Sequence, residues 1–167
     1  MPRRRKKKDY RIPRQSTGPL PWRYGDGFAE HLLVFSDASQ KRNGGLAAVL
    51  FADPAGEPLI GTRTVPWDGS NELELQAALF GLQLAQQHFP FRSLVLFSDN
   101  QDAVTRLKRA RESGLQQDPG LAEMFVQFDL ADALAEPLAN ADVYWVKGHS
   151  ACRGNTLADQ HASKAAA

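Results

Sequence analysis

Apolar residues along the chain fall into two kinds of segment: short uninterrupted runs, and longer stretches in which they recur at helical spacing. The short runs predict strands and the longer stretches predict helices. Strands are expected at 31–36, 46–52, 59–66, 93–98 and 142–146, and helices at 70–88, 100–111, 121–135 and 155–165. The order βββαβααβα predicts an α/β domain with a five-stranded mixed sheet flanked by helices. Three strands form an antiparallel meander and two run parallel.

The helix predicted at 70–88 has one face made of small side chains. Helical spacing places Glu74 on the same side as Ala77, Ala78, Gly81 and Ala85. Small side chains allow a helix to approach a sheet closely. We therefore expect this face to lie on the sheet, with Glu74 near its N-terminal end.

The charge is divided unevenly between a basic N-terminal segment and an acidic body. The chain of 167 residues has a net charge of +1, yet residues 1–14 hold eight of its 20 Lys and Arg and one of its 19 Asp and Glu. Residues 1–21 also contain several prolines and have no repeating apolar face. We predict a basic arm at 1–22, disordered or loosely extended, and one folded domain at 23–167.

Composition narrows the class of protein. Apolar residues make up 43% of the chain and charged residues 23%, which is typical of soluble globular proteins. No apolar run is long enough for a membrane span, and no apolar stretch of a secretion signal follows the basic start. We expect a cytoplasmic protein, and a monomer, since no feature indicates assembly. Cys152 is the single cysteine, which excludes an internal disulfide and a thiolate zinc cluster, so any metal must be held by oxygen or imidazole.

Four acids are predicted to meet at one edge of the sheet. Asp37 and Asp99 each follow a predicted strand, and ligands of α/β sheets collect at the carboxyl ends of strands. Glu74 lies in the first turn of its helix, and Asp159 lies in the first turns of the last helix. Carboxylates placed together repel one another unless a cation binds them, and oxygen ligands favour magnesium or manganese. Two such ions would activate a water and stabilise the leaving oxygen of a phosphodiester.

Each acid also has a simpler explanation as a structural residue. Asp99 could cap the helix that follows it, and Asn71 with Glu74 has the spacing of an N-cap followed by a glutamate at N3. Asp37 could close a turn, and Asp159 could be a solvated helix residue. Independent roles of this kind give no reason for all four acids to meet, so the metal site is the preferred interpretation.

Four segments of the chain resemble a known family. They are FSDAS (35–39), NELELQAAL (71–79), FSDNQDAV (97–104) and WVKGHSACRGNTLAD (145–159). In this order and at this spacing they resemble type 1 ribonuclease H, the bacterial form, over residues 31–165. The resemblance implies a ribonuclease H-like fold and a metal-dependent endonuclease. Such an enzyme hydrolyses the RNA strand of RNA/DNA hybrids without sequence preference by a two-metal-ion mechanism, giving 3′-hydroxyl and 5′-phosphate ends.

The resemblance assigns catalytic roles to five residues. Asp37, Glu74, Asp99 and Asp159 match the family's metal-binding acids, which implies two Mg²⁺ ions as cofactors, with Mn²⁺ as a substitute. His149 matches a histidine on a mobile loop that assists the attacking water or the product. A pKa near neutrality suits a histidine to that role, although a histidine after a strand is more often structural.

Three further residues match positions that contact the substrate in the family. They are Asn43, Asn71 and Gln101, which the resemblance places at the minor groove of the hybrid. That groove is wide and displays 2′-hydroxyls, so amide side chains can contact it without reading bases. The structural alternative for Asn43 and Asn71 is a role in turns and caps.

The chain departs from the family in the region that binds DNA. Well-known bacterial members carry a Lys- and Trp-rich helix and loop between the positions of Asp99 and Tyr144, and this chain does not. Asp37-Ala38-Ser39 also replaces the usual acid-Gly-Ser. We hypothesise that the basic arm compensates through phosphate contacts, the alternative being a solvated or targeting tail. The residues concerned are Arg3, Arg4, Arg5, Lys6, Lys7 and Lys8, with Arg11 and Arg14.

Two other functions remain open from the sequence. A DNA-directed nuclease, transposase or resolvase of the same fold is less favoured, because the Lys147-Gly148-His149 loop and the Glu-Leu-x-Ala-Ala helix are features of the hybrid-cleaving group. A non-catalytic hybrid-binding module is disfavoured as well, because such a module has no physical need for four repelling carboxylates. Comparing hybrid with duplex DNA, and cleavage with binding, distinguishes the three.

Overall fold

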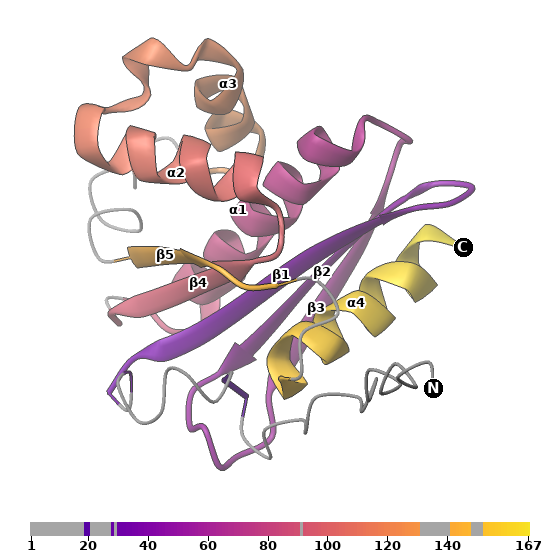
Figure 1. Ribbon diagram of the computed structural model, residues 1–167, viewed down its shortest axis with the longest axis vertical. Coiled ribbons are helices and arrows are strands. Elements are labelled where there is room, and N and C mark those ends of the chain that lie inside the picture. Colours follow the sequence, from indigo (N-terminus) through magenta and orange to yellow (C-terminus); the bar gives the residue numbers. More distant parts are fainter. Residues whose placement is uncertain (1–18, 21–27, 29, 91, 131–140, 148–151) are drawn as a thin grey trace, which may run out of the picture.

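The computed structural model describes residues 19–20, 28, 30–90, 92–130, 141–147 and 152–167. Its elements follow the predicted order, with a short 3₁₀ turn added before the third helix (Figure 1). The strands are β1 (Leu32–Gln40), β2 (Gly44–Phe51), β3 (Leu59–Val65), β4 (Leu94–Ser98) and β5 (Ala141–Trp145). The helices are α1 (Ser70–His88), α2 (Gln101–Ser113), the 3₁₀ turn η2 (Leu115–Gln117), α3 (Pro119–Gln127) and α4 (Arg153–Ala166). Within the described residues, no helix is long and apolar enough to cross a membrane.

The five strands form one sheet in the order β3-β2-β1-β4-β5. β1 pairs with β2, and β2 with β3, in antiparallel register, while β4 lies parallel to both β1 and β5. β1 is therefore the strand at which the antiparallel meander meets the parallel pair. The predicted five-stranded mixed sheet is confirmed.

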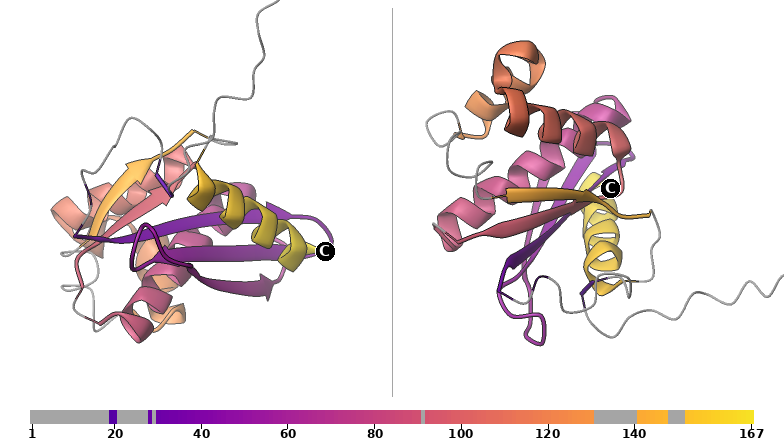
Figure 2. Two further views of the ribbon diagram at one scale, coloured as in Figure 1. Left: turned by 90° about the horizontal axis from the view of Figure 1, so that it is seen from below. Right: turned by 60° about the vertical axis from the view of Figure 1, so that its left-hand side comes forward.

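The helices divide between the two faces of the sheet. α1, α2 and α3 cover one face, and α4 covers the other (Figure 2). Alternate residues of β1 face the two layers: Leu32 and Val34 pack with α1, whereas Leu33 and Phe35 pack on the side of α4. Because apolar side chains fill both faces, the central strands read as continuous apolar runs in the sequence.

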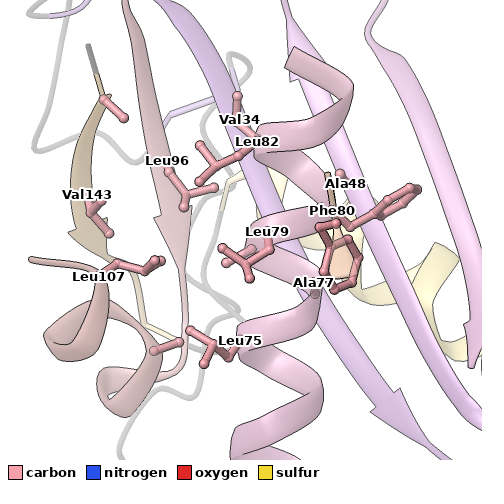
Figure 3. Close-up of a cluster of buried hydrophobic side chains, with 14 of the residues drawn as sticks. Val34, Ala48, Leu75, Ala77, Leu79, Phe80, Leu82, Leu96, Leu107 and Val143 are labelled. Carbon is pink, nitrogen blue, oxygen red and sulfur yellow. The ribbon is translucent and has the colours of Figure 1, made fainter. Parts of the chain in front are cut away.

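The small-residue face of α1 packs against the sheet as predicted. Ala77, Ala78, Gly81 and Ala85 are all buried. Figure 3 shows Ala77 in the buried cluster together with Val34 and Ala48 of the sheet. A Cβ built on Gly81 would lie 3.0 Å from Cγ1 of Val34, so this turn of α1 lies directly on β1. A close approach of α1 to β1 fixes where the N-terminal turns of the helix, including Glu74, stand relative to the strand.

Two predicted elements have different lengths in the structure. β1 does not end at Ser36 but continues to Gln40, because its outer part stays paired with β2 after β4 has ended. α3 was expected to reach Ala135, but it ends at Gln127. Asp129 there adopts a positive φ of 56°, and the amide of Leu130 donates to the carbonyl of Phe125, which closes the helix.

Two residues on the N-terminal side of the predicted arm boundary contact the domain. The carbonyl of Pro19 accepts a hydrogen bond from the amide of Gly154 at 3.3 Å, and Leu20 packs against the apolar cluster under α4. The division of the chain at residue 22 stays a prediction. Cys152, the single cysteine, is fully buried in that apolar cluster, directly before α4.

Candidate metal centre

The candidate site lies where β1 and β4 separate. The two strands run parallel and in register as far as the pair Phe35 and Phe97. An acid follows two residues after each member of this pair: Asp37 after Phe35, and Asp99 after Phe97. Asp37 remains in the sheet through its pairing with Ala47 and is only 3% exposed. The strand register therefore explains why the carboxylates of Asp37 and Asp99 are neighbours, as predicted.

α1 brings the third acid to the same place. Glu74 lies at the start of the helix, and candidate ligand oxygens of Asp37, Glu74 and Asp99 all lie within 4.8 Å of one another. Oε2 of Glu74 is buried and has no hydrogen-bond partner in the described structure. A buried carboxylate oxygen without a donor is costly in a protein interior, and a cation would relieve that cost.

Burial and mutual repulsion hold protons on this cluster when no cation is bound. Burial is the largest cause that raises the pKa of Glu74, to about 10, and the charges of Asp37 and Asp99 add to it. Burial, followed by the charge of Asp99, raises the pKa of Asp37 to about 7. Such shifts are the expected response of carboxylates confined together, and they mark functional sites more often than structural ones.

The donor set fits a hard divalent cation. All three groups are carboxylates; Asp37 is buried, and Glu74 and Asp99 are partly buried. Magnesium and manganese prefer oxygen ligands of this kind and commonly keep some of their waters. A divalent ion would take the place of the protons that the cluster otherwise holds, so the raised pKa values of Asp37 and Glu74 and the unpartnered oxygen of Glu74 agree with a metal site.

The fourth predicted acid lies at the margin of the cluster. Asp159 is exposed on α4, the helix that covers the same face as Phe35, and a hydrogen bond between its carboxyl and Asp37 contributes to the raised pKa of Asp37. It is not one of the three residues whose ligand oxygens converge. The structure therefore places Asp159 beside the cluster, and its role as a metal ligand stays a prediction.

The structure does not contain the helix caps considered above for Asp99 and for Asn71 with Glu74. Asn100 caps α2, with its side-chain oxygen accepting from the amide of Ala103 at 2.8 Å, so Asp99 is not the cap. Gly69 is the N-cap residue of α1 and makes no side-chain cap hydrogen bond. Asn71 accepts a hydrogen bond from the side chain of Asn100 at 2.9 Å, which ties the starts of α1 and α2 together.

The three residues predicted to contact substrate differ in exposure and in hydrogen bonding. Asn71 is exposed at the start of α1, and Gln101 is exposed as the first residue of α2. Asn43 lies in the turn between β1 and β2, where its side chain donates to the carbonyl of Ala167 at 3.4 Å. Their contact with nucleic acid stays a prediction. His149 and the arm residues Arg3 to Lys8 lie outside the described residues.

Two groups near the cluster were not predicted from the sequence, one that holds Asp99 and one that joins three helices. The indole nitrogen of Trp145, at the end of β5, donates to the main-chain carbonyl of Asp99 at 3.0 Å. On the other side of α2, Arg106 pairs with Asp118 through two hydrogen bonds of 2.9 Å and with Glu72 of α1 at 3.4 Å. The signal for the second group was present, since Asp118-Pro119 is a typical helix start.

The fold and the cluster define an α/β protein with an acidic, metal-binding type of site at the carboxyl ends of two parallel strands. A sequence model of the family "RNase H" matches residues 29–167, which is most of the chain. The chain therefore belongs to the RNase H family. A search of curated proteins found no match.

Solved structures of RNase H proteins have the same fold. An N-terminal RNase H domain from Mycobacterium tuberculosis is 20% identical with a TM-score of 0.61, over 81% of this chain and 93% of that chain. RNase H1 from Halobacterium salinarum is 19% identical with a TM-score of 0.55, over 80% and 98%. LC11-RNase H1, solved in complex with an RNA/DNA hybrid, is 17% identical with a TM-score of 0.56, over 81% and 99%. This chain thus spans nearly the whole length of these relatives.

Proposed function

We propose that this protein is a ribonuclease H that hydrolyses the RNA strand of RNA/DNA hybrids without sequence preference and leaves 5′-phosphate ends. The observation that carries the proposal is the convergence of Asp37, Glu74 and Asp99, with ligand oxygens within 4.8 Å of one another, in a member of the RNase H family. That LC11-RNase H1 was solved with a hybrid supports the same substrate for this chain.

In this proposal the three clustered acids, with Asp159, hold two Mg²⁺ ions, and Mn²⁺ can replace them. The bound ions supply a nucleophilic water at neutral pH and charge stabilisation for the leaving oxygen. Asp37 is buried in the sheet and Asp99 is held by Trp145, so neither carboxylate has to be ordered when substrate arrives. His149 would accept or deliver a proton near the leaving group. The monomeric state and the cytoplasmic location are also proposed.

The proposal is tested by cleavage of a labelled RNA/DNA hybrid, with duplex DNA and duplex RNA as controls, in magnesium, in manganese and in chelator. The expected result is metal-dependent cleavage of the RNA strand of the hybrid alone. Cleavage of duplex DNA instead would favour the DNA-directed nuclease. Tight hybrid binding without cleavage in any metal would favour the non-catalytic module.

Two isosteric substitutions distinguish the loss of a carboxylate in the cluster from the loss of a carboxylate elsewhere on the protein. Glu74→Gln should lower kcat by at least about a hundredfold, because the cluster loses a ligand charge where transition-state charge is stabilised. The matched control is Glu123→Gln, an exposed glutamate of α3 far from the cluster in sequence. A Glu74→Gln enzyme as active as Glu123→Gln would contradict the metal role.

A further inference from the structure

Trp67 is an exposed indole in the connection between β3 and α1. Its side chain is 64% exposed, and among the described residues only one other large apolar side chain, Val126 on α3, is exposed to that degree. Single exposed apolar residues are common and need no functional reason. What distinguishes Trp67 is its support and its position, since Val126 lies on an ordinary helix surface.

The main chain on both sides of Trp67 is fixed to the end of the β1–β2 hairpin. The side-chain amide of Gln40, the last residue of β1, donates to the carbonyl of Asp68. On the other side, Gly44 of β2 approaches the carbonyl of Pro66 so closely that an added Cβ would lie 3.1 Å away. Asp68 also accepts from the amide of Gly69 at 2.7 Å. The indole is therefore presented to solvent from an ordered support.

This support borders the acid cluster. A cavity of about 60 Å³ separates the end of β1 from the first turns of α1. It is lined by Ala38, Ser39, Gln40, Ser70, Leu73 and Glu74. Gln40 contributes both to this lining and to the hydrogen bond that holds Asp68, so the connection that carries Trp67 is joined through Gln40 to the cavity that Glu74 lines. In Figure 1 the turn between β1 and β2 lies beside the connection from β3 to α1.

Cationic side chains accompany the indole at this end of the molecule. Lys41 and Arg42 form the tip of the hairpin, and both are exposed. Neither makes an ion pair with another residue of the described part. Exposed cations next to an exposed aromatic side chain are typical of nucleic-acid contacts, in which the cations bind phosphates and the ring lies against sugars or bases.

We propose that Trp67 is a specificity-determining residue that enters the minor groove of an RNA/DNA hybrid, while Lys41 and Arg42 bind phosphates beside it. This inference rests on the proposed function, because it takes the hybrid as the substrate at the neighbouring acid cluster. The wide, shallow groove of an A-like helix admits a flat ring, whereas the minor groove of B-form DNA is only about 6 Å wide. An indole held on a fixed support therefore selects a hybrid over duplex DNA by groove shape.

Binding and turnover are affected differently if this assignment is right. Trp67→Ala should weaken hybrid binding about tenfold, within the range for loss of one aromatic contact to nucleic acid, and duplex DNA binding by less than twofold. KM should rise by a similar factor with kcat unchanged, since the ring lies outside the acid cluster. Trp67→Phe keeps a flat ring and should restore most of the affinity.

The experiment measures fluorescence anisotropy of labelled hybrid and duplex DNA in an Asp37→Asn background, where turnover is blocked, and KM and kcat in the active enzyme. Val126→Ala is the matched control, because it removes an equally exposed apolar side chain from α3. Circular dichroism checks the fold of each variant. Protection of tryptophan fluorescence from acrylamide by bound hybrid should also fall in Trp67→Phe.

Equal effects of Trp67→Ala on hybrid and on duplex DNA, or no effect beyond that of Val126→Ala, would overturn the assignment while leaving the proposed function intact. Failure of the proposed function shows separately, as absence of hybrid cleavage by the unaltered enzyme. If the unaltered enzyme does not cleave the hybrid, the hybrid affinities of the Trp67 variants can still be compared by anisotropy. For the cations, Lys41→Ala with Arg42→Ala should lower the slope of log affinity against log salt by about two; an unchanged slope counts against their part.

Discussion

The indole nitrogen of Trp145 donates a 3.0 Å hydrogen bond to the main-chain carbonyl of Asp99. Trp145 ends β5, and β5 pairs with β4 up to Ser98, the residue before Asp99. The bond therefore continues the parallel strand pair by one step, with a side chain in place of a strand amide. It fixes the main chain at the point where β4 turns into α2, and so fixes the direction in which the Asp99 carboxylate leaves the sheet.

Trp145→Phe should lower kcat about fivefold with little change in KM. Phenylalanine preserves most of the ring packing but cannot donate, and loss of one hydrogen bond of this kind costs about 1 kcal/mol. Because the bond acts on a metal-binding acid, the variant should also need more Mg²⁺ for half-maximal activity. Kinetics over a magnesium titration measure both effects. A variant that is less stable but has an unchanged magnesium requirement would show that Trp145 serves stability alone.

The sequence predicted the type and order of the strands and helices because these depend on local apolar pattern. The sequence pattern does not predict where an element ends when residues distant in the chain set that end. Ser39 and Gln40 are not apolar, yet they belong to β1 because β2 supplies their partners. The end of α3 depends on the left-handed conformation of Asp129, which apolar spacing does not reveal.

The candidate site was predictable to a similar extent. Strand ends and helix starts placed Asp37, Glu74 and Asp99 at one edge, and the structure brings these three together. The hydrogen bond from Trp145 was not predictable, because it joins a side chain to a main-chain carbonyl 46 residues away. The exposure of Trp67 was not predictable either, since the apolar pattern counts a tryptophan as a core residue.

Arg106 holds three helices together in the part of the chain where the family's basic handle is missing. Arg106→Ala should lower the free energy of unfolding by about 1 to 2 kcal/mol, because its two hydrogen bonds to Asp118 are charge-assisted and largely shielded from solvent. Urea denaturation measures the change. We expect kcat to change little, since Arg106 contacts Glu72 and not Glu74.

The pH dependence of that effect has a definite sign. The hydrogen bond from Arg106 lowers the pKa of Asp118 below its ordinary value of 3.8. The stabilisation is therefore present above about pH 4 and is lost as the pH falls through the lowered pKa. The difference in stability between wild type and Arg106→Ala should shrink in acid. A difference that stays constant down to pH 2 would show that packing of the Arg106 side chain is responsible.

Gly154 lets the start of α4 lie directly on β1. A Cβ at this position would overlap the ring of Phe35, so Gly154→Ala should destabilise the protein by about 1 to 3 kcal/mol and displace the helix that carries Asp159. Gly69→Ala is the control, because a Cβ there meets nothing within 4 Å. Thermal unfolding and kcat measure the two consequences. Equal stability of the two variants would mean that α4 adjusts without strain.

The basic arm is predicted to contribute to affinity and not to chemistry. Deleting residues 1–14 removes eight of the 20 Lys and Arg and leaves an acidic body. KM should rise and the salt dependence of kcat/KM should become shallower, because fewer counterions are released on binding. Kinetics at several salt concentrations test this. An unchanged KM and an unchanged salt slope would leave the arm without a role in substrate binding.

Protons and metal ions should compete for the acid cluster, with a measurable effect on stability. The raised pKa of Glu74, about 10, and of Asp37, about 7, means that the folded protein binds protons that the unfolded chain has already released above pH 4 to 5. Without metal, stability is therefore greatest in mild acid and falls as the pH rises through these values. Magnesium replaces the protons, so it should raise Tm more at pH 9 than at pH 5.5.

Glu74→Gln distinguishes this linkage from a general effect of pH. The amide carries no charge at any pH, so at pH 9 the metal-free variant should be more stable than wild type by about 1 to 2 kcal/mol, because folded wild type must keep on Glu74 a proton that the unfolded chain has released. Magnesium should raise its Tm much less than it raises that of Glu123→Gln. Thermal unfolding of each variant is measured in chelator and in magnesium, at pH 5.5 and at pH 9. An equal magnesium effect on the two variants would mean that the ion binds elsewhere on the protein, and the cluster would then have to be explained without a metal.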